Sequence, residues 1–365
     1  MRYVRMPIEV ESPEEYGYGK IRYNLSESSI TDQTLSGLGL TVPDLTLLYG
    51  EHRGSERLRS LIVEGETLAA DDVLITGGAA TALFIISTSL LGPGDHLVVV
   101  RPNYATNLET PRAIGCDISF IDLAFEEGFR IDCDALAAAI TSKTKIISVT
   151  CPHNPSGVMF SEAELRRLVS LAKERGCLLL VDETYRDLSY GGVLPLAASL
   201  GDHVISVSSL SKAYGIPGIR IGWLITRDPR LQELFLAAKE QISICGSVVD
   251  EWIAEEVLSR RAKILAPTLT EMRRRLDVVS DWIAGEELLE WVPPSGGVVC
   301  FPRMRSEPSG GTGAFYERLL SIHGTYVGPG HWFEMPDTYF RLGYGWTTAE
   351  ELEAGLEGIS KALRG

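Results

Sequence analysis

Between residues 72 and 226, short runs of aliphatic and β-branched residues alternate with segments of helical periodicity, and this alternation restricts the fold more than any other feature. The apolar runs are DVLIT, HLVVV, KIISVT, CLLLVD, HVISVS and GWLIT. They lack the period-two alternation of a half-exposed sheet, so we expect strands that helices cover on both faces. The pattern predicts an α/β domain with a mostly parallel sheet.

One of the intervening segments, FSEAELRRLVSLAKERG, carries the signals of a complete helix. Ser161 is the predicted N-cap residue, Glu164 completes a capping box with it, and Gly176 ends the helix. The apolar residues fall on one face of this helix, as expected for packing against a sheet. They are Leu165, Leu168, Val169 and Ala172.

From about residue 230 the pattern changes to longer helices, such as RLQELFLAAKEQI and TLTEMRRRLDVVSDWIA, and then to separated strands around GGVVCFPRM and YFRLGYG. This change predicts a second, smaller α+β domain that the N-terminal segment completes. We therefore expect a large domain at residues 41–264 and a small, substrate-closing domain at residues 1–40 together with 265–365. No Gly/Ser/Pro linker marks the boundary.

Charge and cysteine usage exclude several functional classes. The 365 residues carry a net charge of −15, which argues against nucleic acid or an anionic membrane as a partner. The six cysteines are scattered without a C-x-x-C pair, so we expect free thiols and no metal site. The start, MRYVRMPIEVESPEE, is too acidic for a signal peptide, and LFIISTSLL is too short to span a bilayer. These features predict a cytoplasmic protein.

Chemically useful residues follow five of the predicted strands. GGAATALF follows the first and leads glycines into a helix, whose N-terminus can bind a phosphate. Because the carboxyl ends of parallel strands meet at one edge of a sheet, we expect the five groups to converge. The other four strands are followed by Tyr104, by Asn154, by Asp182 with Tyr185, and by Lys212.

Pyridoxal 5'-phosphate (PLP) is a cofactor that needs this whole set of groups. Its aldehyde requires a lysine for the Schiff base, and its pyridinium nitrogen requires a buried carboxylate. Its ring needs an aromatic face, and its phosphate needs a helix N-terminus with hydroxyl groups and an arginine. The sequence therefore predicts a PLP site.

The chain resembles the class I/II aminotransferase family of fold-type I PLP enzymes from about residue 49 to residue 341. Each matching motif is weak alone, but six occur in the family's order and spacing. They are S-x-S-K with a later Arg (Ser209, Ser211, Lys212, Arg220), N-P-[ST]-G (Asn154 to Gly157), D-x-x-Y (Asp182, Tyr185), the phosphate turn (Gly78, Ala79, Ala80), the entry segment (Tyr49, Gly54, Leu58, Arg59) and f-R-[IL] (Arg341).

The resemblance implies roles for the residues around the cofactor ring. Lys212 is implied to hold the cofactor covalently and then to move a proton between the substrate's Cα and the cofactor. Asp182 is implied to keep the pyridine nitrogen protonated. Tyr185 and Asn154 are implied to bind the ring's phenolic oxygen, and Tyr104 to stack on the ring.

Phosphate and substrate contacts are implied in the same way. Ser209, Ser211 and Arg220 are implied to bind the phosphate with the turn Gly78–Ala80, and the apolar RIGWLIT favours a buried Arg220. Arg341 is implied to bind the substrate's α-carboxylate. Tyr49 is implied to reach the phosphate of a neighbouring subunit, which predicts a homodimer with shared active sites; an ordinary packed tyrosine is the alternative.

The side chain of the substrate is less defined. Glu27 and Asp32 lie in RYNLSESSITDQ, the segment that folds over the substrate in the family, and could receive a cationic group such as a guanidinium or be solvated loop acids. We expect an aminotransferase that moves an amino group from an L-amino acid to a 2-oxo acid. The alternative is a PLP-dependent lyase, cyclase or oxidase that acts on an arginine-like amino acid in specialised metabolism.

Two further classes fit the sequence poorly. A transcription regulator with an aminotransferase-like sensor domain needs a basic helix-turn-helix, and none precedes the domain. A Rossmann dehydrogenase needs a G-x-G-x-x-G turn, which GGAATALF lacks.

Overall fold

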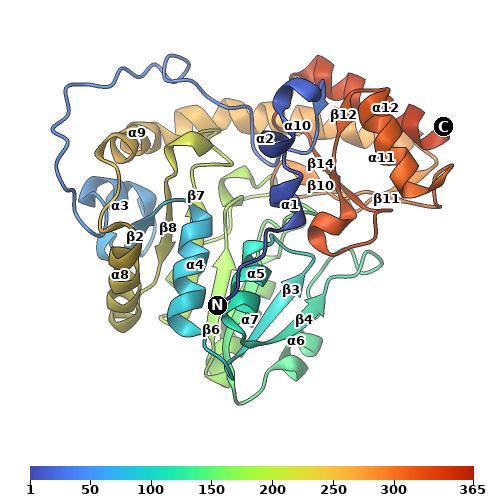
Figure 1. Ribbon diagram of the computed structural model, residues 1–365. Helices are drawn as coiled ribbons and strands as arrows, with labels where there is room; N and C mark the ends of the chain where they lie inside the picture. The colour runs from blue at the N-terminus through green and yellow to red at the C-terminus, as the bar shows by residue number, and fades with distance from the viewer.

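A seven-stranded sheet forms the centre of the computed structural model, which describes all residues from 1 to 365 (Figure 1). The strand order is β2-β8-β7-β6-β5-β3-β4, and only β8 runs antiparallel to its neighbours. The predicted α/β class with a mostly parallel sheet is confirmed. The strands are β2 (Val73–Thr76), β3 (His96–Arg101), β4 (Asp117–Asp122), β5 (Thr144–Thr150), β6 (Leu178–Asp182), β7 (Val204–Ser209) and β8 (Gly222–Ile225).

Strand β4 is the one strand of this sheet that the sequence pattern did not predict. Its sequence, DISFID, is mostly half-exposed because β4 pairs only with β3 at the edge of the sheet. An edge strand of this kind lacks the continuous apolar run that marks a strand buried on both faces.

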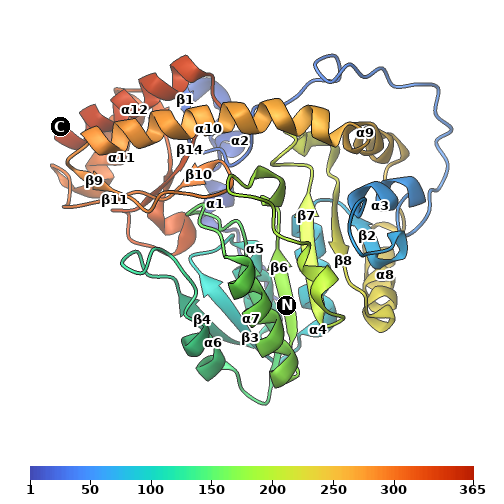
Figure 2. The same cartoon turned by 180° about the vertical axis from the view of Figure 1, so that it is seen from behind.

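Helices cover both faces of the sheet, as Figures 1 and 2 show from opposite sides. Alternate strand residues enter two separate cores, so that Val99 packs with α4 and α8, whereas Val98 packs with α6 and α7. The helices on the first face are α4 (Ala79–Leu90), α5 (Thr106–Ile114) and α8 (Pro229–Ser243); those on the second are α6 (Cys133–Ala139) and α7 (Glu162–Arg175).

Helix α7 confirms the helix predicted from local signals. Ser161 and Glu164 form the capping box, and Gly176 ends the helix in the left-handed conformation at φ +68°. The four predicted apolar residues are its buried residues.

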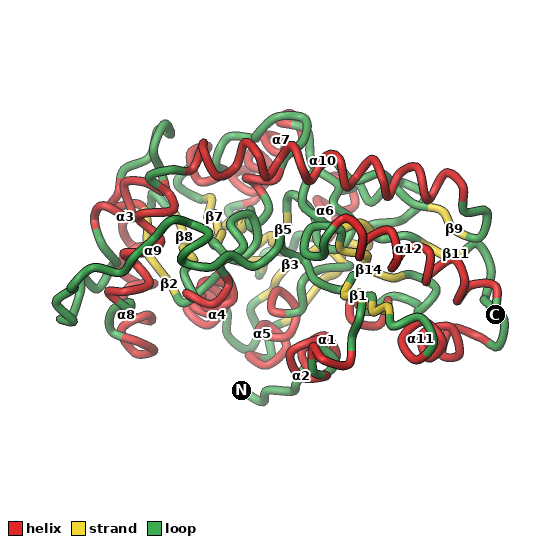
Figure 3. The backbone as a smooth tube through the Cα atoms, turned by 90° about the horizontal axis from the view of Figure 1, so that it is seen from above, coloured by secondary structure: helices red, strands yellow, loops and turns green.

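The C-terminal part builds smaller sheets against a long helix. Strand β1 (Tyr23–Asn24) of the N-terminal segment pairs in parallel with β12. Helix α10 runs without interruption through residues 264 and 265, the boundary expected from the sequence (Figures 2 and 3). The division into two domains stays a prediction. The elements here are α9 (Val248–Leu258), α10 (Arg261–Gly285), β9 (Leu289–Glu290), β10 (Val299–Cys300), β11 (Arg303–Met304), α11 (Gly311–Ser321), β12 (Thr325–Tyr326), β13 (Gly328–Pro329), η6 (Gly330–Phe333), β14 (Phe340–Gly343) and α12 (Ala349–Arg364).

Short helices of the N-terminal segment lie in front of the gap between the central sheet and the C-terminal part (Figure 1). They are α1 (Pro7–Val10), α2 (Pro13–Tyr16) and η1 (Tyr18–Lys20). A loop then extends away from the body before α3 (Glu56–Ile62). None of the helices combines the length and the apolar character that a membrane crossing requires.

Candidate active site

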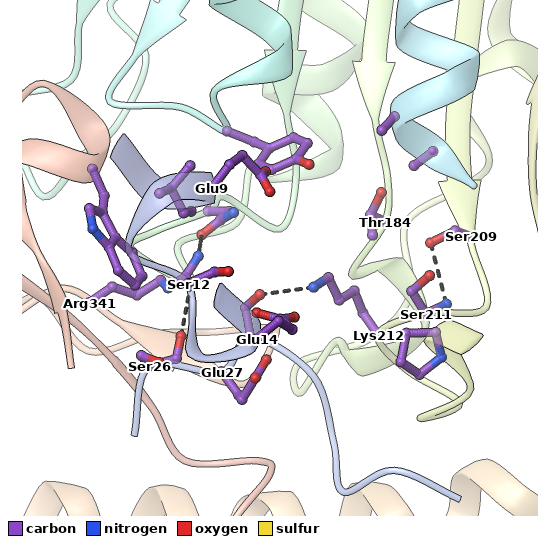
Figure 4. A pocket seen from close by; sticks show the side chains of 18 of the residues that line it. Glu9, Ser12, Glu14, Ser26, Glu27, Thr184, Ser209, Ser211, Lys212 and Arg341 are labelled. Carbon is purple, nitrogen blue, oxygen red and sulfur yellow. Dashed lines mark hydrogen bonds between the residues drawn. The ribbon is translucent and has the colours of Figure 1, made fainter. Parts of the chain in front are cut away.

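A cavity of about 480 Å³ opens at the carboxyl ends of β5, β6 and β7. Twelve of the fourteen site residues predicted from the sequence line it, which places groups from distant parts of the chain in one space. Figure 4 shows Lys212 and Arg341 pointing toward this space from opposite sides. The twelve residues are Glu27, Ala79, Ala80, Tyr104, Asn154, Asp182, Tyr185, Ser209, Ser211, Lys212, Arg220 and Arg341.

Lys212 lies in the turn that follows β7. Its Nζ donates to the Ser28 hydroxyl at 2.9 Å, across from the sheet. Burial lowers the pKa of the Lys212 amine, and the nearby Glu27 carboxylate opposes that shift. A larger share of neutral amine is available than on an exposed lysine, which is the form that attacks an aldehyde.

Asp182 ends β6 and is 4% exposed. Its Oδ1 accepts the Thr184 backbone N–H at 3.1 Å and the Thr184 hydroxyl at 2.6 Å. Burial raises the pKa of this carboxyl, while the Thr184 bonds and the Asn107 side chain act in the opposite direction. A buried carboxylate at this position suits a cationic partner such as a protonated pyridine nitrogen.

The N-terminus of α4 forms an anion-binding cradle. Gly78 is the N-cap residue and no side chain caps the helix, so the first N–H groups of α4 face the cavity unpaired by a cap. Gly78 adopts φ +93°, a conformation that favours glycine, and a Cβ there would lie 2.5 Å from the Arg220 guanidinium and displace it. Together with Ser209 and Ser211, these donors fit a phosphate group.

Arg220 corrects one expectation from the sequence. The apolar residues after it favoured a buried side chain, but Arg220 is exposed at the mouth of the cavity. Its backbone adopts the left-handed conformation at φ +48°, and its guanidinium donates to the Pro217 carbonyl at 2.8 Å. The turn therefore directs the side chain out of the core, although the next strand, β8, is buried.

Two tyrosines contact the cavity from different loops. Tyr104 follows β3 and lines the cavity beside the Asp182 region. Tyr185 is buried, and its hydroxyl donates to the Ser28 carbonyl at 2.7 Å. Burial raises the pKa of Tyr185 to about 12, so the phenol keeps its proton. The contacts that both residues would make with a cofactor ring stay predictions.

Arg341 lies on β14 and is 4% exposed. It donates to Asn154 Oδ1 at 3.2 Å and to the Ser26 carbonyl at 2.8 Å, while its buried Nε has no partner. The Phe333 ring lies 5.1 Å from the guanidinium carbon. Arg341 lines the cavity, where its planar guanidinium suits an acceptor such as a carboxylate.

The two predicted site residues that do not line the cavity are Gly78, which precedes the lining residue Ala79, and Tyr49. Tyr49 is 82% exposed in the long loop and contributes nothing to the cavity of its own chain. Asp32, one of the two candidate acids for a cationic substrate, lies outside the cavity and accepts the Trp346 indole N–H at 2.9 Å. Glu27 does line the cavity, and the Tyr18 hydroxyl donates to it at 3.1 Å.

Sequence reasoning missed the wall that residues 5–15 build. This wall carries three carboxylates in addition to Glu27, and burial raises the pKa of Glu27. The acidic run in IEVESPEE was the available signal, but nothing local connects it with strand ends more than 60 residues away. The residues of this wall are Arg5, Ile8, Glu9, Ser12, Pro13, Glu14 and Glu15.

Comparisons with known proteins identify the family of the chain. The family "Aminotransferase class I and II" matches residues 45–359. The chain is 31% identical over 349 residues to capreomycidine synthase of Streptomyces vinaceus (94% of this chain, 88% of that protein). It is 30% identical over 299 residues to arginine–pyruvate transaminase AruH of Pseudomonas aeruginosa (78% and 74%). The solved structure of the PLP-dependent cyclase OrfR matches with a TM-score of 0.89 at 28% identity (100% and 98%). The chain therefore belongs to the class I and II aminotransferase family of PLP-dependent enzymes.

Proposed function

We propose that this enzyme is an aminotransferase that moves the amino group of a basic, arginine-like L-amino acid to a 2-oxo acid. The observation that carries the proposal is the composition of the cavity wall. Arg341 offers its guanidinium to an α-carboxylate, while Glu27 and Glu14 supply negative charge in the same cavity. A substrate with a carboxylate and a cationic side chain satisfies both ends.

The residues of the chain support this chemistry. When bound, PLP supplies the electron sink that stabilises the charge left at Cα after the α-proton is lost. Lys212 would attach the cofactor through its aldehyde, and its amine, with a pKa lowered by burial, is suited to take up and return the Cα proton. Asp182 would hold the proton on the pyridine nitrogen, and the α4 N-terminus with Arg220 would hold the phosphate.

A homodimer with shared active sites is part of the proposal. Tyr49 is 82% exposed, and its neighbours Leu47 and Leu48 are 78% and 59% exposed on the same loop. A row of exposed apolar residues is typical of a surface that another chain covers. A second copy would bury this loop and allow Tyr49 to reach the phosphate of that copy.

Cyclisation or elimination of the same kind of substrate is a second candidate reaction. The match with capreomycidine synthase covers 94% of the chain and so includes part of residues 1–44, which lie outside the family match at 45–359. That relative is named a synthase, and the solved structure that matches over the whole chain is named a cyclase, which supports a reaction other than transamination as the alternative.

The experiment that tests the proposal mixes PLP-loaded enzyme with each common amino acid, in the absence of oxygen and with or without a 2-oxo acid. Transamination predicts that arginine or a derivative converts the bound cofactor to its amine form, and that a 2-oxo acid restores the starting spectrum. Loss of substrate to a cyclic or eliminated product without an oxo acid supports the second candidate. Equal reaction of neutral and acidic amino acids contradicts the basic-substrate proposal.

Glu27→Gln should weaken the binding of cationic substrates selectively. Loss of one charged partner predicts a rise in KM of roughly tenfold for arginine-like substrates and little change for neutral ones. Because burial raises the pKa of Glu27, the KM of a cationic substrate should also rise in wild-type enzyme as the pH falls through that pKa. Steady-state kinetics with matched cationic and neutral amino acids measures both effects.

Asp32→Asn is the matched control, because Asp32 lies on the same segment but outside the cavity. It should leave the KM of both substrate classes unchanged. An equal loss with neutral substrates in Glu27→Gln would assign Glu27 to the structure of the segment rather than to recognition.

A further inference from the structure

The N-terminal wall of the cavity is attached to the protein almost entirely through side chains. Residues 1–21 form no backbone hydrogen bond with any later residue; the first is the Arg22 N–H to the Gly324 carbonyl at 3.0 Å. The segment nevertheless supplies seven residues of the cavity wall. Its position at the cavity therefore depends on side-chain contacts, which include the packing of Ile8 in one core with Trp332 and Phe333.

Most of the polar contacts of this segment with the rest of the chain involve Glu11, which lies between α1 and α2. Glu11 Oε2 accepts the Trp332 indole N–H at 2.7 Å and lies 2.8 Å from His331 Nε2. The Tyr326 hydroxyl donates to the Glu11 carbonyl at 2.7 Å. Apart from Glu11, only Tyr18 bonds outward, to Glu27. One carboxylate oxygen thus makes both polar contacts of the segment with η6, beside the apolar packing of Ile8.

Trp332 connects the contact between Glu11 and η6, called the Glu11 bridge below, with the substrate site. Its ring lines the cavity, and the Arg341 guanidinium carbon lies 5.9 Å from the ring centroid. Trp332 is 4% exposed, and the bond to Glu11 satisfies its indole N–H. The contact of Glu11 that holds the N-terminal segment therefore also orients the Trp332 ring beside Arg341, the residue expected to bind the α-carboxylate.

His331 makes this bridge sensitive to protonation. Its Nδ1 lies 2.8 Å from Asp337 Oδ1, opposite the contact of Nε2 with Glu11. A neutral imidazole carries one N–H and can donate to only one carboxylate, whereas the imidazolium donates to both. The groups that face this cluster are the carboxylates of Glu11 and Asp337 and the phenols of Tyr326 and Tyr316, which donate to the carbonyls of those two residues. Burial lowers the pKa of His331, but the two carboxylates together outweigh burial and raise the pKa above 6.5.

We propose that Glu11 is a positioning residue for substrate binding: through protonated His331 and through Trp332 it holds residues 5–20 against the substrate cavity, and loss of the His331 proton loosens this wall. The proposal rests on the proposed function in that the cavity binds the amino-acid substrate. For a group whose pKa is raised in the folded state, the added stability is present below pH 6.5 and is lost as the pH rises through the raised pKa.

Hydrogen exchange measured by mass spectrometry on the PLP-loaded enzyme tests the attachment without using activity. After correction for intrinsic rates, peptides from residues 1–21 should exchange about tenfold faster at about pH 9 than at about pH 6. Glu11→Gln and His331→Gln should both exchange fast at either pH. Glu317→Gln, an exposed acid on α11 without side-chain bonds, is the control and should behave as wild type.

Kinetics tests the positioning role on the same variants. In wild-type enzyme, KM should rise as the pH increases through the raised pKa of His331. Glu11→Gln should raise KM about tenfold and change kcat less than twofold, and its KM should not rise further at alkaline pH. Melting temperatures close to wild type identify the effect as local. Unchanged exchange in both Glu11→Gln and His331→Gln overturns the proposal, as does faster exchange with an unchanged KM. If no amino acid reacts with wild-type enzyme, the proposed function fails, while the exchange data still decide the attachment.

Discussion

Replacing Lys212 with alanine should abolish covalent binding of PLP and lower kcat by about four orders of magnitude. Two functions are lost at once, because the same amine attaches the cofactor and is placed to move the Cα proton, and a positioned acid–base group alone contributes about 10²–10⁴-fold. No second amine replaces it, since Lys212 is the only lysine that lines the cavity.

Borohydride reduction followed by mass spectrometry measures the covalent bond directly. Wild-type enzyme should carry the cofactor mass on the peptide that contains Lys212, and Lys212→Ala should carry none. Lys263→Ala, at an exposed position of α10, is the control and should retain both the adduct and activity. A reduced adduct on another lysine of the Lys212→Ala enzyme, such as the buried Lys239, would contradict the assignment.

The central sheet and the cofactor end of the cavity were predictable because their signals are local. Each buried strand is a continuous apolar run, and the residues that follow it meet at one edge through the geometry of parallel strands alone. Asp182 and Lys212 follow such runs directly, so their convergence needed no knowledge of loop conformation. The same rule failed for β4, whose exposure at the sheet edge removes the apolar run.

The substrate end was less predictable because its residues converge through tertiary contacts. Glu11 lies 320 residues before His331 and 321 before Trp332, and no periodicity in the sequence links them. Glu27 and Asp32 lie five residues apart in the same segment, yet only Glu27 enters the cavity. The direction of the chain after β1 determines which of the two acids enters the cavity, and this direction cannot be predicted from composition.

Arg220 illustrates the same limit within a predicted motif. Its place in the phosphate cradle follows from the spacing to Lys212, but its exposure depends on a left-handed backbone conformation at φ +48°. A non-glycine residue rarely adopts this conformation, so the turn was not expected. The prediction of a buried side chain, which rested on the apolar neighbours, was therefore wrong. The backbone turn, and not the hydropathy of the segment, determines where the guanidinium lies.

Arg341→Ala should lower kcat/KM for every amino-acid substrate alike. The expected loss of transition-state stabilisation is about 2–4 kcal/mol, the range for truncating one partner of a buried charged pair. The variant removes the Arg341 guanidinium from the cavity wall and leaves Asn154 Oδ1 without its donor. Arg341→Lys keeps the charge but not the planar fork, so it should recover only part of the loss.

Because the phosphate cradle and Lys212 are unchanged, PLP binding should survive in Arg341→Ala, and the visible absorbance of the bound cofactor measures this. Arg274→Ala, at an exposed position of α10 paired with Glu271, is the control and should keep wild-type kinetics. A loss confined to basic substrates would place Arg341 at the side-chain end of the cavity, and an unchanged kcat/KM would exclude it from the substrate site. A uniform loss instead fixes the α-carboxylate at Arg341 and leaves Glu27 and the N-terminal wall to distinguish the side chains.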